Sequence, residues 1–397
     1  MAADKARFYL EKAVPELKEY EKKGIFSKDE IRSIAKKRSD FEHKVNASGV
    51  SPSDFARYAE YEMNLETLRK KRTKRLGVKA AAQHTGRRTL FILDRATRKC
   101  PGDLGLWVQY IEFCRQQKMY RRLSDVFADA LRLHPSKAEL WIYAAKYTLE
   151  EHADMTQARS YFQRGLRFCK TQRNMWVQYG KLECIYIAKL SARRRILGLD
   201  QPPQEKSALT EAVDEDADMM ALPKITAEDI NPELGKEDGV DEGALKTLDA
   251  TPALTGAIPM AIFDAAMKQS ANNPILAHEF FDMIFEFEDL PCLRKIVDHV
   301  VAQQLSTSPN TYHTAICHIK SPVAGIRVTS PEFPRAFGTS LSHMKKYQMG
   351  FDLAQELTGW LKVLSENKEL DPSLQKAVMM TIGRVQRDLA PKHGSQD

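Results

Sequence analysis

The sequence predicts an all-α protein, a right-handed α-solenoid of helical hairpins with a helical segment before the hairpins and a helical cap after them. Trp107, Trp141 and Trp176 are spaced by 34 and 35 residues, and each opens a stretch with bulky or apolar residues every third position. A second stretch, with a large residue three positions before a small one, recurs between them at the same spacing. A fixed period of this length, with two helical stretches per period, is typical of hairpin solenoids.

The same spacing predicts a core made by neighbouring hairpins together. One hairpin is too small to bury its own apolar face, so aromatic residues of one helix are expected to pack against small residues of the next. A position fixed by such packing is more simply a core position than a platform for stacked RNA bases. The predicted repeat core consists of Phe55, Tyr58, Trp107, Tyr110, Ala130, Trp141, Gly165, Trp176, Tyr179, Phe263 and Phe281.

Residues 1–50 are predicted to form an N-terminal helical hairpin that docks partners. An apolar stripe predicts one helix over residues 3–23, and Gly24 is placed to end it. Ser27 and Glu30 have the spacing of a capping box, which predicts the start of a second helix.

Residues 51–199 are predicted to hold the first three hairpins and the first helix of the fourth. The first helix is expected to be capped at Ser53 or Asp54, and a helix over residues 87–99 completes the first hairpin. Phe55 and Trp107 are 52 residues apart, which predicts an extended first helix or connector in that repeat.

Residues 200–251 carry 15 acidic residues and 4 lysines, a net charge of −11, while the whole chain carries +7. With several prolines and no helical stripe, they are predicted to be a disordered insert within the fourth hairpin. Residues 252–320 should hold the second helix of that hairpin, starting at Pro259, and repeats five and six. Three prolines between residues 322 and 334 interrupt the pattern. Residues 335–390 should form C-terminal helices at 349–366 and 372–389.

Composition restricts the class of protein. No apolar run approaches the length needed to cross a bilayer, and the first 25 residues do not resemble a secretory signal. The six cysteines are scattered, as expected for free thiols in the cytosol or nucleus. The basic charge outside the acidic insert favours a polyanionic environment without showing RNA contact.

The sequence offers no set of residues for catalysis. It contains no phosphate-binding loop and no G-x-S-x-G nucleophile motif, so we expect no enzyme and no cofactor. His313, Cys317 and His318 lie close together, but without a fourth ligand they are better explained by packing than by zinc. The acidic run at 214–218 lacks the glycine and final glutamate of a calcium loop, so no metal is expected.

The densest positive charge lies between residues 68 and 76. A solvated helix face, a nuclear-import signal and a patch that contacts RNA phosphates are all compatible with it. The candidate patch consists of Arg69, Lys70, Lys71, Arg72, Lys74 and Arg75.

The repeat pattern resembles the HAT (half-a-TPR) repeat, in which an aromatic residue opens the first helix and an aromatic–Glu pair follows. Phe55-x2-Tyr58-x2-Tyr61-Glu62 shows it in full. Further segments at residues 7–11, 21–28, 36–43 and 68–72 are similar to the U3 small nucleolar RNA-associated protein 6 family.

This resemblance implies a non-catalytic nucleolar scaffold within the UTP-B complex of the small-subunit processome. The implied partners are WD40 β-propeller subunits of that complex, with pre-rRNA and U3 small nucleolar RNA in the same particle and direct RNA contact left open. The implied process is early pre-rRNA processing toward 18S rRNA. No membrane and no small-molecule substrate is implied. A HAT scaffold of splicing or mRNA 3′-end processing, or a solenoid that binds RNA directly, are the alternatives.

Overall fold

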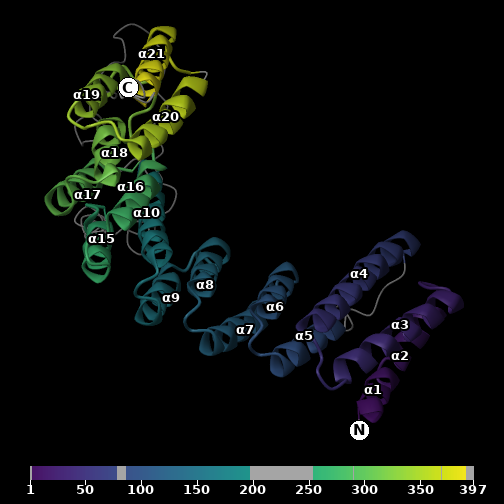
Figure 1. The fold of residues 1–397 in the computed structure, drawn as a ribbon. Coiled ribbons are helices and arrows are strands. Elements are labelled where there is room, and N and C mark those ends of the chain that lie inside the picture. The colour runs from purple at the N-terminus through teal and green to yellow at the C-terminus, as the bar shows by residue number, and fades with distance from the viewer. Residues whose placement is uncertain (1, 78–85, 197–253, 289, 368, 390–397) are drawn as a thin grey trace, which may run out of the picture. The chain divides into compact units, whose positions relative to one another are not determined.

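The computed structural model describes residues 2–77, 86–196, 254–288, 290–367 and 369–389. Throughout these residues the regular structure is helical and no strand is present, so the predicted all-α fold is confirmed (Figure 1). Many helices that are adjacent in sequence pack against each other in pairs, which is consistent with a helical solenoid. The details that would distinguish a HAT solenoid from other helical repeats stay a prediction.

The chain divides into two compact units, Met1–Ala144 and Ala145–Asp397, and α8 contains the division. The predicted segment boundaries are set by repeats and composition, whereas these units are set by contacts. The first unit contains α1 (Ala2–Glu11), α2 (Val14–Lys22), α3 (Lys28–Asn46), α4 (Pro52–Leu76), α5 (Arg87–Lys99), α6 (Leu104–Gln116), α7 (Tyr120–Leu133) and the start of α8 (Ala138–Glu151).

The single N-terminal helix predicted over residues 3–23 is wrong, because the structure has two helices there. Helix α1 ends at Glu11 and α2 begins at Val14. Pro15 has no N–H to donate to the carbonyl of Glu11, and its ring would clash with that carbonyl. The proline instead occupies the first turn of α2, where no donor is needed. Gly24 follows α2 with φ of 64°, as its role in ending the helix predicts.

The capping box at the start of α3 is confirmed. The Ser27 hydroxyl accepts a hydrogen bond from the Glu30 backbone N–H at 3.3 Å, and the Glu30 carboxylate accepts one from the Ser27 N–H at 2.9 Å. Helix α4 begins earlier than predicted, with Ser51 as its N-cap and Asp54 completing the box. Pro52 suits the first helical position, so the helix starts there. Helix α4 runs for 25 residues, so an extended helix explains the wide first spacing.

The three repeated tryptophans are buried, and each makes the same kind of hydrogen bond. Each indole Nε1–H donates to the backbone carbonyl six residues earlier: Trp107 to Pro101 at 3.0 Å, Trp141 to Pro135 at 2.9 Å and Trp176 to Lys170 at 2.9 Å. The ring therefore fills the core while its N–H holds the turn that enters the helix. The remaining predicted core residues are also buried, namely Phe55, Tyr58, Tyr110, Ala130, Gly165, Tyr179, Phe263 and Phe281.

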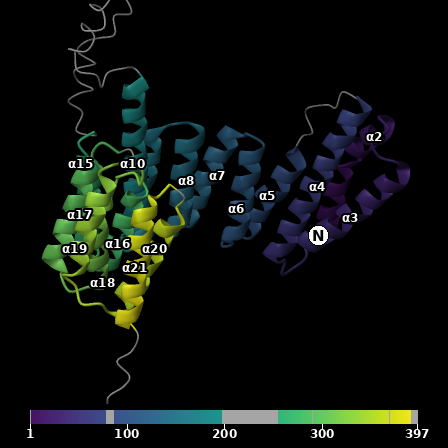
Figure 2. The ribbon, with the colours of Figure 1, turned by 90° about the horizontal axis from the view of Figure 1, so that it is seen from above.

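The second unit continues the pairing of helices. Its helices are the rest of α8, α9 (Met155–Phe168), α10 (Arg173–Ile196), α15 (Ala257–Gln269), α16 (Pro274–Phe285), α17 (Leu293–Thr307), α18 (Tyr312–Lys320), the short 3-10 helix η2 (Ser321–Val323), α19 (Phe333–Met344), α20 (Phe351–Glu366) and α21 (Pro372–Leu389). Helix α10 packs directly against α15 (Figure 2). The two helices thus form a pair although many residues separate them in the sequence. The predicted insert at 200–251 lies outside the described residues.

Phe280 of α16 lies close to Gly180 of α10. A Cβ atom at this position would lie 2.5 Å from Cε2 and 2.7 Å from Cζ of the Phe280 ring, which is fully buried. We expect Gly180→Ala to lower the free energy of unfolding by about 1–3 kcal/mol, as overpacking does. Urea unfolding would measure the change. Gly359→Ala in helix α20, where nothing lies within 4 Å, is the matched control and should be neutral or stabilising. Equal effects of the two variants would contradict this packing.

The region of the three prolines near residue 330 also contains helical structure that the pattern did not predict. Pro322 lies in η2, and Pro334 lies in the first turn of α19, a helix that the pattern did not predict. Proline is tolerated at both places because those N–H groups have no partner within the helix. Residues of α19, α20 and α21 share one apolar cluster, built on Phe333, Phe337, Leu361, Leu370, Val378 and Ile382.

Candidate functional site

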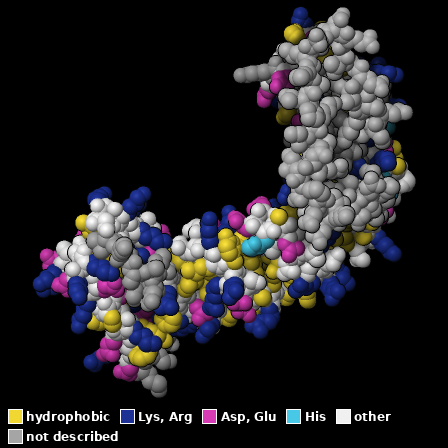
Figure 3. All heavy atoms as spheres, turned by 180° about the vertical axis from the view of Figure 1, so that it is seen from behind, with side chains coloured by type: hydrophobic (Ala, Val, Ile, Leu, Met, Phe, Trp, Pro, Cys, Tyr) yellow, Lys and Arg dark blue, Asp and Glu magenta, His cyan; other side chains and the backbone are white. Residues whose placement is uncertain are grey.

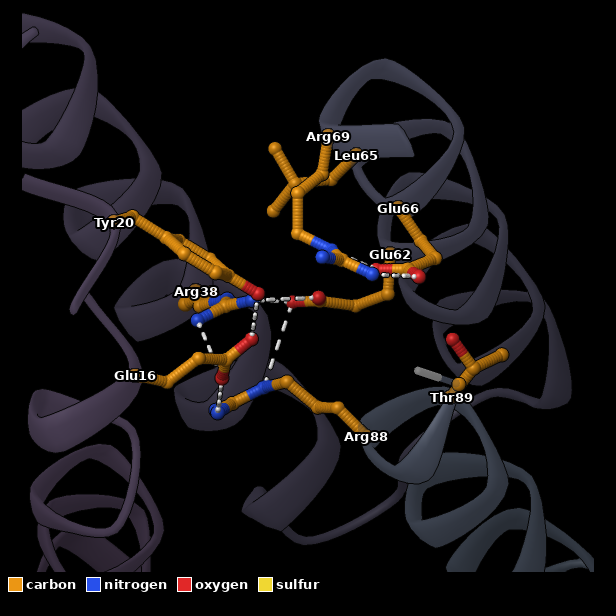
Figure 4. Close-up of a pocket in the computed structure, with 10 residues that line it drawn as sticks. Glu16, Tyr20, Arg38, Glu62, Leu65, Glu66, Arg69, Arg88 and Thr89 are labelled. Carbon is orange, nitrogen blue, oxygen red and sulfur yellow. Dashed lines mark hydrogen bonds and ion pairs between the residues drawn. The ribbon is translucent and has the colours of Figure 1, made fainter. Parts of the chain in front are cut away.

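The first unit buries an ion pair between α3 and α4 (Figure 4). Arg38 is 2% exposed and Glu62 is 3% exposed. The Arg38 guanidinium donates from Nε at 2.7 Å and from Nη2 at 2.8 Å to the two carboxylate oxygens of Glu62. Such a two-pronged contact fixes direction as well as distance, so it sets how α3 lies against α4.

Residues of α2 and α5 extend this pair. The Glu16 carboxylate lies 3.5 Å from Nη1 of Arg38 and 3.8 Å from Arg88, and Arg88 lies 3.5 Å from Glu62. The Tyr20 hydroxyl donates to Glu16 at 2.5 Å. Burial raises the pKa of Tyr20, and the negative charge of Glu16 raises it further, so the phenol stays a donor at neutral pH.

The charges of the carboxylates and guanidinium groups balance around this pocket, a small cavity of about 20 Å³. Its charged lining residues are three acids, Glu16, Glu62 and Glu66, and three arginines, Arg38, Arg69 and Arg88. Because these charges meet one another inside the chain, the pocket needs no counter-ion. We interpret it as the structural centre of the first unit, which we call the ion-pair centre.

A second buried carboxylate, Glu42 of α3, joins the same helices. It accepts a hydrogen bond from the Tyr58 hydroxyl at 3.1 Å and two from Arg95 at 3.0 and 3.1 Å. Arg95 also donates to Asn46 at 3.2 Å. Tyr58, predicted only as an apolar core residue, therefore also holds a buried charge. The burial of Arg38 could have been suspected from the sequence, because Arg38 stands in the apolar stripe of α3 between Ile34 and Phe41.

Two residues of the predicted basic patch are engaged within the chain. Arg69 is 4% exposed and donates to both oxygens of Glu66, at 2.7 and 2.6 Å. Arg72 donates to both oxygens of Glu30 at 2.7 Å and to the Ile25 carbonyl at 3.1 Å. The hydrogen bond from Arg72 holds the pKa of Glu30 at about 2. These two arginines serve the fold of the N-terminal helices.

The other four residues of the patch are exposed: Lys70, Lys71, Lys74 and Arg75. Lys70 donates a hydrogen bond at 3.3 Å to Gln117, the residue that follows α6. The patch ends at the C-terminus of α4, where the helix dipole favours positive charge. Figure 3 shows Lys and Arg side chains, in dark blue, near apolar side chains, in yellow, on the described surface. Of the six patch residues, these four have their charged groups accessible to a phosphate-bearing partner.

The histidines and the cysteine of the considered metal cluster do not converge. His313 meets His278, with 3.1 Å between their Nδ1 atoms, whereas His318 meets the Tyr347 hydroxyl at 2.7 Å. Cys317 is fully buried, and burial raises the pKa of its thiol. Over the described ranges, no group of three or more His, Cys, Asp or Glu residues could hold a metal ion. In the same ranges, no helix has the length and apolar character needed to span a membrane.

Comparison with known proteins gives a family resemblance over the helices just described. Residues 10–94, which contain every residue of the ion-pair centre, match the family model described as U3 small nucleolar RNA-associated protein 6. The chain is 36% identical over 237 residues to the Schizosaccharomyces pombe protein of that name, covering 57% of this chain and 48% of that protein. It is 35% identical over 188 residues to the human homolog, covering 46% and 31%.

A Dictyostelium discoideum homolog is 26% identical over 294 residues, covering 72% of this chain and 46% of that protein. These matches confirm the resemblance predicted from the sequence. The matched part of the chain spans about half or less of the length of each of these curated relatives.

Proposed function

We propose that this chain is a non-catalytic scaffold subunit of a nucleolar pre-ribosomal particle that contains the U3 small nucleolar RNA. The observation that carries the proposal is the match of residues 10–94 to a family whose description names association with that RNA. The relatives from Schizosaccharomyces pombe and human carry the same description. A role in ribosome biogenesis follows from that description.

The arrangement of the first unit supports a scaffold. The charges of the ion-pair centre are matched by one another inside the first unit, so they are not set out for a substrate. Helices α4 to α7 pack in succession and present extended faces on which segments of partner proteins can lie. Within this proposal the particle is the small-subunit processome, and the direct partners are WD40 β-propeller subunits of the UTP-B complex. The process served is early processing toward 18S rRNA.

Affinity purification of the tagged chain from cells tests the proposal. We expect U3 small nucleolar RNA and several β-propeller proteins to co-purify above the level of an untagged control. RNA blotting and mass spectrometry would measure them. Spliceosomal or 3′-end-processing components in their place would favour the alternative HAT machines and overturn the proposal.

Direct RNA binding is a second candidate function, favoured by the four exposed patch residues. We expect replacement of Lys70, Lys71, Lys74 and Arg75 by glutamine to flatten the salt dependence of binding to single-stranded RNA. For every RNA phosphate that these side chains neutralise, the replacement should reduce the slope of log affinity against log salt by about 0.7. Filter binding by the purified chain over a salt series would measure the slope.

The matched control removes four exposed lysines elsewhere in the first unit, at Lys18, Lys22, Lys36 and Lys44. It changes the net charge equally without touching the patch. If both variants flatten the slope equally, the effect comes from overall charge. If neither changes it, the patch does not contact RNA and the chain reaches RNA through its protein partners.

A further inference from the structure

An apolar groove lies between α3 and α4, outside the ion-pair centre. Its volume is about 290 Å³. Figures 1 and 2 both show these two helices side by side. Its apolar lining consists of Phe26, Ile34, Leu65 and Leu68, and Lys37 and Tyr61 lie at its side.

The floor of the groove is part of a packed core. Phe26 and Ile34 are buried in the apolar cluster of the N-terminal helices, and Leu65 packs against that cluster. Leu68 stands at the edge and is 41% exposed. The groove has an apolar floor and an exposed leucine at its edge. Covering these surfaces with another apolar side chain removes them from water and therefore favours binding.

Positive charge borders this apolar floor. Lys37 lies with its Nζ 5.6 Å from the centre of the Tyr61 ring. Steps of three and four residues along α4 lead from Leu68 to Lys71 and Arg75, so both continue the face of Leu68 by one and two turns. The one carboxylate in the lining, Glu30, is already paired with Arg72. An incoming segment therefore meets an apolar hollow beside exposed cations.

We propose that this groove docks a segment of a partner protein that places one aliphatic or aromatic side chain in the hollow and aspartate or glutamate residues beside Lys37, Lys71 and Arg75. The proposal deepens the scaffold function and rests on it only for the identity of the partner. The floor favours a protein over RNA, because bases stack on accessible aromatic rings, whereas Phe26 is buried and Tyr61 is approached by Lys37.

The test uses two labelled helical peptides of equal length. Both carry leucine and phenylalanine at three- and four-residue spacing, and the other positions are Glu and Asp in one peptide and Lys in the other. Fluorescence anisotropy with the purified full chain should show binding of the acidic peptide and much weaker binding of the basic one. We expect Leu68→Asp to weaken acidic-peptide binding by about tenfold or more, and Arg75→Glu by about threefold to tenfold.

Matched controls lie in the same unit. Leu133→Asp changes a leucine of α7 that is 46% exposed, and Lys70→Glu reverses a charge on the side of α4 that faces Gln117. Both should bind the acidic peptide within about twofold of the unchanged chain. Circular dichroism melting should show that Leu68→Asp still folds, because the side chain it replaces is at the surface.

Equal binding of both peptides, or full binding by Leu68→Asp, would overturn the proposal. Binding of single-stranded oligouridine that Leu68→Asp abolishes, with no acidic-peptide binding, would assign the groove to RNA and overturn it too. The scaffold function is tested separately by U3 RNA co-purification. Loss of that association with peptide binding intact would count against the scaffold function alone.

Discussion

Replacing Glu62 with alanine is expected to lower the free energy of unfolding by about 3–5 kcal/mol, because it leaves the buried Arg38 without its two-pronged partner. Glu16 makes only a longer ion pair with Arg38, with its carboxylate 3.5 Å from Nη1, so it does not replace the two short hydrogen bonds to Glu62. Urea unfolding of the purified chain, followed by the helical circular dichroism signal, would measure the loss.

Two further variants separate the ion pair from general effects of substitution. Glu60→Ala changes an exposed glutamate on the same helix and should shift stability by no more than about 0.5 kcal/mol. The double variant Arg38→Met with Glu62→Leu removes both charges and should recover much of the stability lost in Glu62→Ala. A Glu62→Ala chain as stable as the Glu60→Ala chain would show that Arg38 is not left as an uncompensated buried charge when Glu62 is removed.

Replacing Trp141 with alanine is expected to cost about 3–5 kcal/mol, the range typical of a large aromatic side chain removed from a core. The indole is 5% exposed, and Tyr143 two residues on packs edge-to-face with Phe127 of α7. Thermal melting of the purified variant, followed by circular dichroism, would show a lower midpoint. An unchanged midpoint would contradict the assignment of the tryptophans to the repeat core.

Trp141→Phe separates the ring from its N–H group. It keeps most of the apolar volume but loses the hydrogen bond to the Pro135 carbonyl, so we expect a loss of about 1 kcal/mol beyond the smaller ring volume. A phenylalanine variant as unstable as the alanine variant would mean that the hydrogen bond, and not the ring, holds the helix in place.

Local patterns were sufficient to predict most of the helices. The predicted helix over residues 87–99 is α5 residue for residue, and the predicted 372–389 helix is α21. The capping box of Ser27 and Glu30 was also predictable, because its partners are three residues apart. In the capping box the two stabilising hydrogen bonds lie within three residues, so a short stretch of sequence contains both partners.

The structure differs from the prediction in two situations. In one, a local effect opposes the apolar pattern, and in the other, the contact joins residues far apart in the sequence. Pro15 breaks an apolar stripe that is otherwise continuous, so periodicity alone joined α1 and α2. Within the basic patch, Arg72 and Lys71 look alike in sequence. Only the fold brings Glu30, 42 residues away, against Arg72, and so separates a structural arginine from its exposed neighbours.

The ion-pair centre could not be located from the sequence for the same reason. Arg38 and Glu62 are 24 residues apart on different helices, and surface charges with that separation are common. The apolar stripe of α3 hinted at a buried arginine but did not name its partner. Contacts of this kind depend on how helices cross, which a residue pattern does not fix.

The hydrogen bond from each tryptophan to the carbonyl six residues earlier has a consequence for the order of folding. Such a contact closes a very short loop, whereas the ion pair between Glu16 and Arg88 closes one of 72 residues. Short loops lose little chain entropy on closing, so they form early and rapidly. The turns at Pro101 and Pro135 should therefore be set before the N-terminal charges meet, and the slow step in folding of the first unit should be the arrival of α2 at α5.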